Sequence, residues 1–521
     1  MTALLASIGF DRWILHVLLA LPLVAAVPIL LAPAALARRI ALVATTVEFL
    51  LSLGLWWAVD TSPGTLQLTV SVPWIEAWGI SYAVGIDGIS LTMVLLTTLL
   101  MPLCVLGSWN YITERERGYY AMLLTLLTGV LGVFVATDLF LFYVFWEVML
   151  IPMYFIIGIW GGKNRLYATI KFFLFTMAGS LLMLVAILVL AWMVAGKTGT
   201  LSFAYEHLLA NSSAAGSLAP WLFAAFALAF AVKVPVFPLH TWLPDAHVEA
   251  PTAGSVLLAG VLLKMGTYGF LRFAVPFFPE VATSPWVTNL ILALAVIGII
   301  YGALVAMVQP DIKKLVAYSS VSHLGFVMLG IWAATVQSLQ GAIMIMIGHG
   351  LATGALFFLV GMLYERRHTR MIADFGGVAR AAPLLATAFA ITAFASIGLP
   401  GLNGFVGEFL VLLGSFGRFP LATLIATTVV IFAAAYLLWA VQRVFFNPVT
   451  DPANASIRDL DHRELAVLVP LIAAMVWMGL YPNPLLRRTE AASRHYVELV
   501  RPHLQPAAGS AADRPIAEAR Q

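Results

Sequence analysis

Long apolar segments recur along this chain at the length of a membrane-spanning helix, and they restrict its possible folds more than any other feature. A helix needs about 20 apolar residues to cross a bilayer. Windows of that length predict fourteen spans: 13–33, 40–59, 89–110, 119–136, 139–160, 168–195, 220–247 (broken), 252–275, 286–308, 313–333, 338–363, 382–413 (broken), 420–446 and 465–482. The sequence therefore predicts an all-α polytopic membrane protein.

The composition fits a chain that is solvated by lipid. Of its 521 residues, 62% are hydrophobic and only 10% are charged, whereas about 25% of the residues in a soluble domain are charged. The net charge of +3 is small and the basic residues are scattered, which argues against nucleic-acid binding. The single cysteine, Cys104, excludes an intramolecular disulfide and a cysteine-based metal site, and we interpret it as a small buried side chain.

The distribution of basic residues indicates the orientation of the spans, because Lys and Arg concentrate in cytoplasmic loops. If the amino terminus is outside, 16 basic residues lie in cytoplasmic turns and 4 lie on the opposite side before the tail. The first group is Arg38, Arg39, Arg115, Arg117, Lys163, Arg165, Lys171, Lys313, Lys314, Arg366, Arg367, Arg370, Arg380, Arg443, Arg458 and Arg463, and the second is Arg12, Lys197, Arg272 and Arg418. We therefore expect the amino terminus on the outer side of the membrane.

Two lysines and two glutamates remain near the middle of predicted spans: Lys233, Lys264, Glu147 and Glu408. An ionisable side chain at the bilayer centre costs about 2.5–3.5 kcal/mol even on the more lenient scales. One alternative is that Glu147 and Lys233 form a buried pair that only ties two helices together. However, the attraction within a buried ion pair often does not offset the cost of desolvating its two charges. One pair also does not account for all four groups. We interpret the four as part of an ion-translocation path.

Two of the predicted spans are interrupted, at "KVPVFPLHTWLP" and at "IGLPGLNG". Irregular backbone at membrane depth is tolerated only where it is buried in protein or lines a watery cavity. Paired interruptions in two halves of a chain are typical of inverted-repeat transporters. We therefore divide the chain into amino-terminal helices with a short surface hairpin (1–118), two inverted five-helix repeats that each form a half-channel (119–275 and 286–446), and the last membrane helix with a polar tail (447–521).

Two histidines fall between these charges in the sequence, His323 in the tenth predicted span and His349 in the eleventh. Each could be a neutral donor that ties helices together, or part of a proton relay, because imidazole titrates near neutral pH. Both interpretations remain open, although hydroxyl-bearing residues nearby favour a relay. These hydroxyls are those of Ser319, Ser320, Ser322 and Thr353. Of the remaining polar groups, we interpret His240 and His247, beside the first break, as solvated, and His16 and Glu48 as structural.

Four stretches resemble one known family. They are "DLFLFYVFWEVMLIPMYFIIGIWGG", "AVKVPVFPLHTWLPDAHVEAPTAGSVLLAGVLLKMGTYG", "PDIKKLVAYSSVSHLGFV" and "SIGLPGLNGFVGEF". Together they resemble the antiporter-like subunits of respiratory complex I, over roughly residues 80–500. Within that family the chain is most similar to the M-type branch, because the L and N types have lysine where this chain has Glu408, and the L type carries a long amphipathic helix and a further span after its last helix. The polar tail is longer than the fold needs, and the sequence gives it no function.

The resemblance implies a proton-translocating membrane subunit of NADH:quinone oxidoreductase. In that family Glu147 would partner Lys233 and adjust its proton affinity, and Lys264 would be the central carrier. Glu408 would gate the far half-channel, with His323 and His349 on the polar axis between them. An alternative is a subunit of a multisubunit sodium/proton antiporter or of a membrane-bound hydrogenase. A purely structural subunit, in which the charges only tie helices together, is a further alternative.

We find no motif for a cofactor in this chain. It has no glycine-rich strand–turn–helix fingerprint for nicotinamide or flavin and no cysteine set for iron–sulfur clusters. The resemblance implies that NADH, FMN, iron–sulfur clusters and quinone belong to partner subunits, and that the L-type and N-type subunits and the bilayer are the direct neighbours of this chain. Moving Glu147 toward or away from Lys233 would then be a switch that needs no cofactor, since a nearby carboxylate favours a charged ammonium and burial disfavours it.

Overall fold

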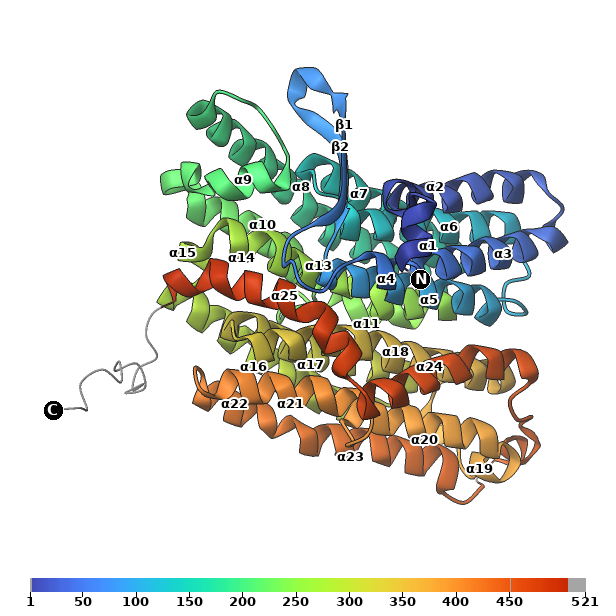
Figure 1. The fold of residues 1–521 in the computed structure, drawn as a ribbon. Coiled ribbons are helices and arrows are strands. Elements are labelled where there is room, and N and C mark those ends of the chain that lie inside the picture. The colour runs from blue at the N-terminus through green and yellow to red at the C-terminus, as the bar shows by residue number, and fades with distance from the viewer. Residues whose placement is uncertain (1, 450, 505–521) are drawn as a thin grey trace.

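The computed structural model describes residues 2–449 and 451–504. Its long helices run side by side in one bundle (Figure 1). Thirteen helices in the described residues are long and apolar enough to cross a membrane, by length and composition. The fourteenth expected span, 382–413, is the one split into two shorter apolar helices. The predicted all-α polytopic architecture is confirmed.

The amino-terminal part contains three long helices and a hairpin. Its elements are α1 (Thr2–Ser7), α2 (Phe10–Leu31), α3 (Ala34–Leu53), α4 (Leu55–Ala58), β1 (Gln67–Ile75), η1 (Glu76–Trp78), β2 (Ile80–Ile86) and α5 (Gly88–Gly107). β1 and β2 pair antiparallel, with Val70 opposite Val84, and Gly79 adopts a left-handed conformation before β2. Asp87 then begins α5, because its carboxylate accepts hydrogen bonds from the backbone amides of Ile89 and Ser90.

Five spans follow, and the fourth of them is broken. The elements are α6 (Glu116–Val135), α7 (Leu139–Trp160), α8 (Arg165–Thr198), α9 (Tyr205–Asn211), η2 (Ser212–Leu218), α10 (Ala219–Lys233), α11 (Trp242–Glu249), α12 (Thr252–Leu257), η3 (Leu258–Leu262), α13 (Leu263–Gly269), η4 (Phe270–Ala274), α14 (Val275–Phe277) and α15 (Pro279–Ala282). α10 ends at Lys233, and the following prolines Pro235 and Pro238 cannot donate the backbone hydrogen bonds that a helix needs. The Trp242 indole donates to the Val232 carbonyl over 2.9 Å, so it holds α11 against the end of α10.

Five further spans repeat the same order, again with a broken fourth member. The elements are α16 (Pro285–Met307), α17 (Ile312–Ala333), α18 (Val336–Arg367), η5 (Ile372–Asp374), α19 (Val378–Ala381), α20 (Pro383–Ile397), α21 (Asn403–Phe416), α22 (Pro420–Thr427), α23 (Val429–Val441) and η6 (Gln442–Phe446). Gly398 and Gly401, at the break between α20 and α21, both have positive φ angles that other residues rarely adopt. A shared order of spans is what two five-helix repeats predict.

The carboxy-terminal elements are η7 (Pro452–Ser456), α24 (His462–Leu480), α25 (Asn483–Val500) and η8 (Arg501–His503). α25 is an amphipathic helix whose buried face includes Leu485, Tyr496 and Val500. The carbonyl of Leu486 accepts a hydrogen bond from the Gln340 side chain over 2.9 Å. The sequence analysis regarded the polar tail as longer than the fold needs, yet its residues 483–503 pack against the bundle. The rest of that tail, 505–521, lies outside the described residues.

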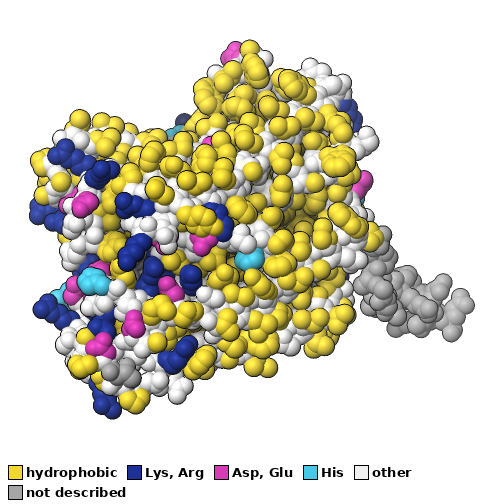
Figure 2. Space-filling model, turned by 180° about the vertical axis from the view of Figure 1, so that it is seen from behind, with side chains coloured by type: hydrophobic (Ala, Val, Ile, Leu, Met, Phe, Trp, Pro, Cys, Tyr) yellow, Lys and Arg dark blue, Asp and Glu magenta, His cyan; other side chains and the backbone are white. Residues whose placement is uncertain are grey.

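The centre of the bundle is formed by α17, α18 and the stretch from α12 to α14. Almost all residues of these helices are buried, whereas α2, α8, α16 and α23 expose many of theirs. Figure 2 shows one face of the molecular surface, where hydrophobic side chains cover most of the area and Lys and Arg gather toward one end. A polar side chain on α13, α17 or α18 is therefore shielded from lipid by the outer helices.

Cys104 provides a first test of this packing. It is completely buried in α5, and its Sγ atom lies 4.0 Å from the Ala253 carbonyl oxygen. We expect Cys104→Ser to cost less than roughly 1 kcal/mol of stability, because a serine hydroxyl can donate to the Leu100 carbonyl one turn earlier in its own helix. The amount of the chain in membrane vesicles and the ion translocation that the sequence predicts should both stay near the wild-type values. A normal amount of protein with lost translocation would reveal a role for the thiol.

Candidate functional site

Lys264 lies at the centre of the molecule on a helix with unusual geometry. Its segment α13 is flanked by two π-helical turns, η3 and η4, and π turns within α-helices often occur at functional sites. The side chain is completely buried. Its Nζ atom donates to the Ala259 carbonyl, in the first π turn, and lies 2.7 Å from His349 Nδ1. The ammonium thus has two polar partners in a site that lipid does not reach.

His349 continues this contact toward the second half of the chain. Its ring on α18 lies 5.6 Å, centroid to centroid, from that of His323 on α17, at an interplanar angle of 65°. His323 Nδ1 lies 3.2 Å from Glu408 Oε1 on α21. All four residues are at most 8% exposed. Lys264, His349, His323 and Glu408 therefore form one continuous line of buried titratable groups.

The tautomers of the two imidazoles depend on the protonation of their partners. When Lys264 is a charged ammonium it only donates, so that His349 Nδ1 accepts and His349 Nε2 carries the ring proton. When Glu408 is ionised it only accepts, so that His323 Nδ1 donates to it. Both Nε2 atoms are buried and have no hydrogen-bond partner within the described chain. These two nitrogens are the positions between which a proton would pass to complete the line.

A small cavity of about 20 Å³ opens beside this line at the second helix break. It is lined by His323, His349 and Glu408 together with Asn403 and Ser396. A cavity of this size has room for about one water molecule, which needs two to four polar partners. The sequence analysis did not select Asn403 or Ser396, although both lie in or beside the "SIGLPGLNG" break that it identified.

Lys233 has a different environment. It is 1% exposed, at the end of α10, and its Nζ atom contacts Met149 Sδ at 3.6 Å. The rings of Trp146 and Phe172 each lie 5.5 Å from the ammonium, a distance at which aromatic faces attract a cation. The expected contact with Glu147 is not made, since their N and O atoms are not within 4.0 Å of each other. The aromatic and thioether groups occupy the space around the ammonium instead.

Glu147 is half-buried on α7 and faces Lys233 without touching it. Its nearest polar neighbours are Ser180 and Tyr143, and Oε1 is buried without a hydrogen-bond partner among the described residues. The two groups interact through space across a gap. The predicted pair is therefore present as two neighbouring charges that are not in contact.

A substitution tests whether this open pair matters. We expect Glu147→Ala to lower the rate of proton translocation by roughly threefold, because Lys233 then loses the one nearby charge that favours its ammonium form. Glu147→Asp keeps a carboxylate on the same helix and should retain most of the rate. Proton uptake and complex content would be measured together in inverted vesicles. Equal rates for the alanine variant and the wild type would show that Glu147 does not influence the relay.

Three basic residues that the sequence analysis placed beside a helix break or in a cytoplasmic turn, and so near solvent, are buried. His240 and His247 are 3% and 0% exposed, and Lys313, counted among the cytoplasmic turns, is 7% exposed. His247 stacks on Phe357 at 4.6 Å between ring centroids. Lys313 Nζ lies 2.6 Å from the Ala250 carbonyl oxygen at the end of α11. The solvated interpretation was wrong because α11 folds back against α17 and α8 rather than leaving the bundle.

The hydroxyl groups near the histidines are largely occupied by backbone carbonyls. Ser319 donates to Val316, and Ser322 donates to Ile299 across to the neighbouring α16. Thr353, in contrast, lines the cavity beside His349. Of the hydroxyls that were expected near the relay, Thr353 is thus the one placed beside the small cavity. Within residues 2–449 and 451–504, no cluster of three or more His, Cys, Asp or Glu could hold a metal ion.

Two family models match the chain. The model described as NADH:quinone oxidoreductase/Mrp antiporter, transmembrane, matches residues 136–433, which include every residue of the line from Lys264 to Glu408. The chain belongs to this family. A second model, for the amino terminus of NADH-ubiquinone oxidoreductase chain 4, matches residues 39–137 of this antiporter-family chain.

Several relatives are similar to this antiporter-family chain over most of its length. NADH-quinone oxidoreductase subunit M of Rhodobacter capsulatus is 48% identical over 454 residues, which cover 86% of this chain and 88% of the relative. The Pseudomonas aeruginosa subunit M is 47% identical and is covered to 92%. NADH-ubiquinone oxidoreductase chain 4 of Chondrus crispus is 42% identical and is covered to 96%.

Solved structures show the same fold. A chain of respiratory complex I from Thermus thermophilus superposes with a TM-score of 0.84 at 35% identity, covering 93% of this chain and 99% of that one. A chain of the Mrp complex from Dietzia has a TM-score of 0.83 at 21% identity and covers 94% of this chain and 99% of its own. The second likeness shows the fold alone.

Proposed function

We propose that this chain is the M-type membrane subunit of a respiratory NADH:quinone oxidoreductase and that it translocates protons. The observation that carries the proposal is the continuous buried line of titratable groups, Lys264, His349, His323 and Glu408. A structural subunit would have no need for four such groups in contact at membrane depth, where each is costly. The identity of 47–48% to the M subunits of two bacteria supports the assignment of the complex.

In this mechanism Lys264 is the central proton carrier. Its ammonium donates a proton to His349 Nδ1, and the ring releases its other proton from Nε2 toward His323 Nε2. His323 then delivers its Nδ1 proton to the Glu408 carboxylate beside the second helix break. Each step joins atoms that the structure holds at hydrogen-bond distance, except the step between the two Nε2 atoms, where the rings are adjacent.

Lys233 and Glu147 act before this line as the switch. When the Glu147 carboxylate lies close, it favours the charged form of Lys233, and when the two separate, burial favours release of the proton. The aromatic and thioether contacts of Lys233 stabilise the separated form. A conformational change in neighbouring subunits that moves α7 against α10 would therefore set the proton occupancy of the relay.

We further propose that the energy comes from partner subunits and that this chain holds no redox centre. NADH, FMN, iron–sulfur clusters and quinone would be bound by those partners, and the L-type and N-type antiporter-like subunits would be its neighbours in the membrane. The excess of basic residues in one set of turns supports a periplasmic amino terminus in a bacterial inner membrane.

Purification in mild detergent tests the assignment. We expect the chain to co-purify with a peripheral arm that contains flavin and iron–sulfur clusters, and inverted vesicles to acidify on addition of NADH. Co-purification with sister antiporter-like subunits alone, together with sodium/proton exchange in liposomes without a redox substrate, would instead support the multisubunit antiporter that shares this fold.

A further inference from the structure

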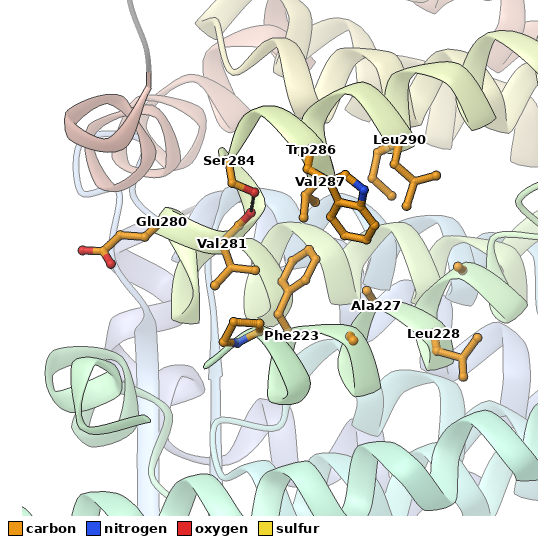
Figure 3. A pocket seen from close by; sticks show the side chains of 13 residues that line it. Phe223, Ala227, Leu228, Glu280, Val281, Ser284, Trp286, Val287 and Leu290 are labelled. Carbon is orange, nitrogen blue, oxygen red and sulfur yellow. Dashed lines mark hydrogen bonds between the residues drawn. The ribbon is translucent and has the colours of Figure 1, made fainter. Parts of the chain in front are cut away.

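A deep groove runs along the lipid-facing surface between α10 and α16, away from the relay. Its volume is about 520 Å³. Ala224, Ala227 and Ala231 form one wall on α10, where their spacing puts them on one face, and larger side chains such as Leu290 form the other wall on α16. Figure 3 shows Phe223, Trp286 and Leu290 around this space. We propose that the groove binds one acyl chain of a phospholipid with an amine headgroup.

The length of the groove fits one leaflet of a bilayer. The residues that line it on α10 extend from Pro220 to Ala231, which is about 16 Å at 1.5 Å per residue. The hydrocarbon core of a bilayer is about 30 Å thick. The groove therefore runs from one membrane surface to about the middle, as an acyl chain does, and not through the whole membrane.

The lining of the groove suits a hydrocarbon chain. Apart from Glu280, Ser284 and Trp286 near one end, every residue that lines it has a purely apolar side chain. An acyl chain can therefore lie along the groove without leaving a polar group unpaired.

The end of the groove at residues 280–286 has the chemistry of a headgroup region. Trp286 and Trp221, near the starts of α16 and α10, are 73% and 74% exposed, and tryptophan is enriched at the depth of lipid headgroups. Among the described residues that line the groove, Glu280 is the only charged one. Its side chain is 84% exposed at this end, and its Oε1 atom lies 3.8 Å from Nδ1 of His503. A carboxylate attracts an ammonium headgroup and repels an anionic one. An ethanolamine headgroup therefore fits better than a glycerol headgroup.

The position of the groove gives the lipid a role. The groove reaches Ala231, two residues before Lys233 and the first helix break. An acyl chain there covers the back of the helix that carries Lys233 and fills the space between the two five-span halves. It would keep water away from the break on the lipid side while leaving α10 free to move.

Photo-crosslinking in the intact complex tests the proposal. Membranes would be labelled with phosphatidylethanolamine that carries a diazirine on its acyl chain, and adducts would be mapped by mass spectrometry. We expect adducts on 220–231 and 286–291 at higher yield than on the exposed apolar residues Leu421 and Leu424 of α22. Ala227→Phe fills the groove and should lower the groove adducts roughly tenfold. Ala422→Phe, the same exchange on α22, should leave them unchanged.

The same experiment separates the alternatives. Unchanged groove adducts in Ala227→Phe, or no preference for the groove over α22, would overturn the proposal. Crosslinks from Trp286 or Leu290 to another polypeptide, without lipid adducts, would show a protein occupant and overturn it as well. For the headgroup, a phosphatidylglycerol probe should label the groove less than the ethanolamine probe, and Glu280→Gln should remove that difference. Equal labelling by both probes in the wild type would contradict the amine preference.

Discussion

Replacement of Lys264 by methionine is expected to lower proton translocation by at least about tenfold, which corresponds to 1.36 kcal/mol or more in the limiting barrier. Methionine keeps the length and the packing of the side chain but cannot carry a proton. His349 Nδ1 also loses the donor that now lies 2.7 Å away. The measurement is the rate of proton uptake by inverted vesicles on NADH addition, normalised to complex content.

Assembly should not suffer from this substitution, because removal of a charge from the bilayer centre also removes its cost of about 2.5–3.5 kcal/mol. Lys264→Arg adds a second comparison. Arginine keeps the positive charge but does not deprotonate in proteins, so it should fail as well. Lys197→Met, at an exposed site outside the relay, should pump normally. Normal pumping by Lys264→Arg would show that only the charge, and not its titration, matters.

Much of the fold could be predicted because the spans, the helix breaks and the charges inside spans can each be recognised from a short segment of the sequence. The helix breaks follow from prolines and glycines within apolar segments, as at Pro235 and Gly398. The candidate relay groups follow from a single rule: an ionisable side chain inside a membrane span is energetically costly and is therefore usually functional. Lys264 and Glu408 were therefore identifiable without any knowledge of their neighbours.

The contacts between these groups could not be predicted, because they join residues that are far apart in the chain. Lys264 and His349 are 85 residues apart, as are His323 and Glu408. Which side chains meet depends on how α13, α17, α18 and α21 pack, and no sequence pattern records that packing. The same reason explains the separation of Lys233 from Glu147, since the three side chains that surround the ammonium come from α7 and α8.

The burial of Lys313 and His247 was missed for a related reason. Lys313 follows a turn and looks like a solvated loop cation, yet the carbonyls that accept its hydrogen bonds belong to residues 248 and 250. A chain segment that returns into the bundle supplies partners that the local sequence does not contain. The amphipathic α25 was missed because its mixed polar and apolar residues have a use only where α5 and α18 offer a surface to bury one face.

Glu408→Gln separates the two roles that the second break allows for this carboxylate. One role is to accept a proton from His323, and the other is to satisfy backbone amides that the break leaves free. In the described chain the Glu408 side chain is bonded to His323 at 3.2 Å, and no backbone amide donates to it. The backbone also leaves room for the carboxylate, since a side chain at Gly398 would lie 3.0 Å from Glu408 Oε2. The geometry thus favours the proton acceptor.

Glutamine keeps the shape and hydrogen bonding of Glu408 but does not titrate, so we expect normal complex content and a loss of roughly fivefold to tenfold in proton translocation. Glu408→Asp should retain part of the rate, because it titrates although its carboxylate lies farther from His323. Glu206→Gln, the same exchange at an exposed site on α9, controls for the chemistry of the substitution. Protons moved per NADH would be measured in inverted vesicles. Normal pumping by Glu408→Gln would remove this carboxylate from the path, and the relay would then have to leave His323 by way of the small cavity that His323 shares with Asn403 and Ser396.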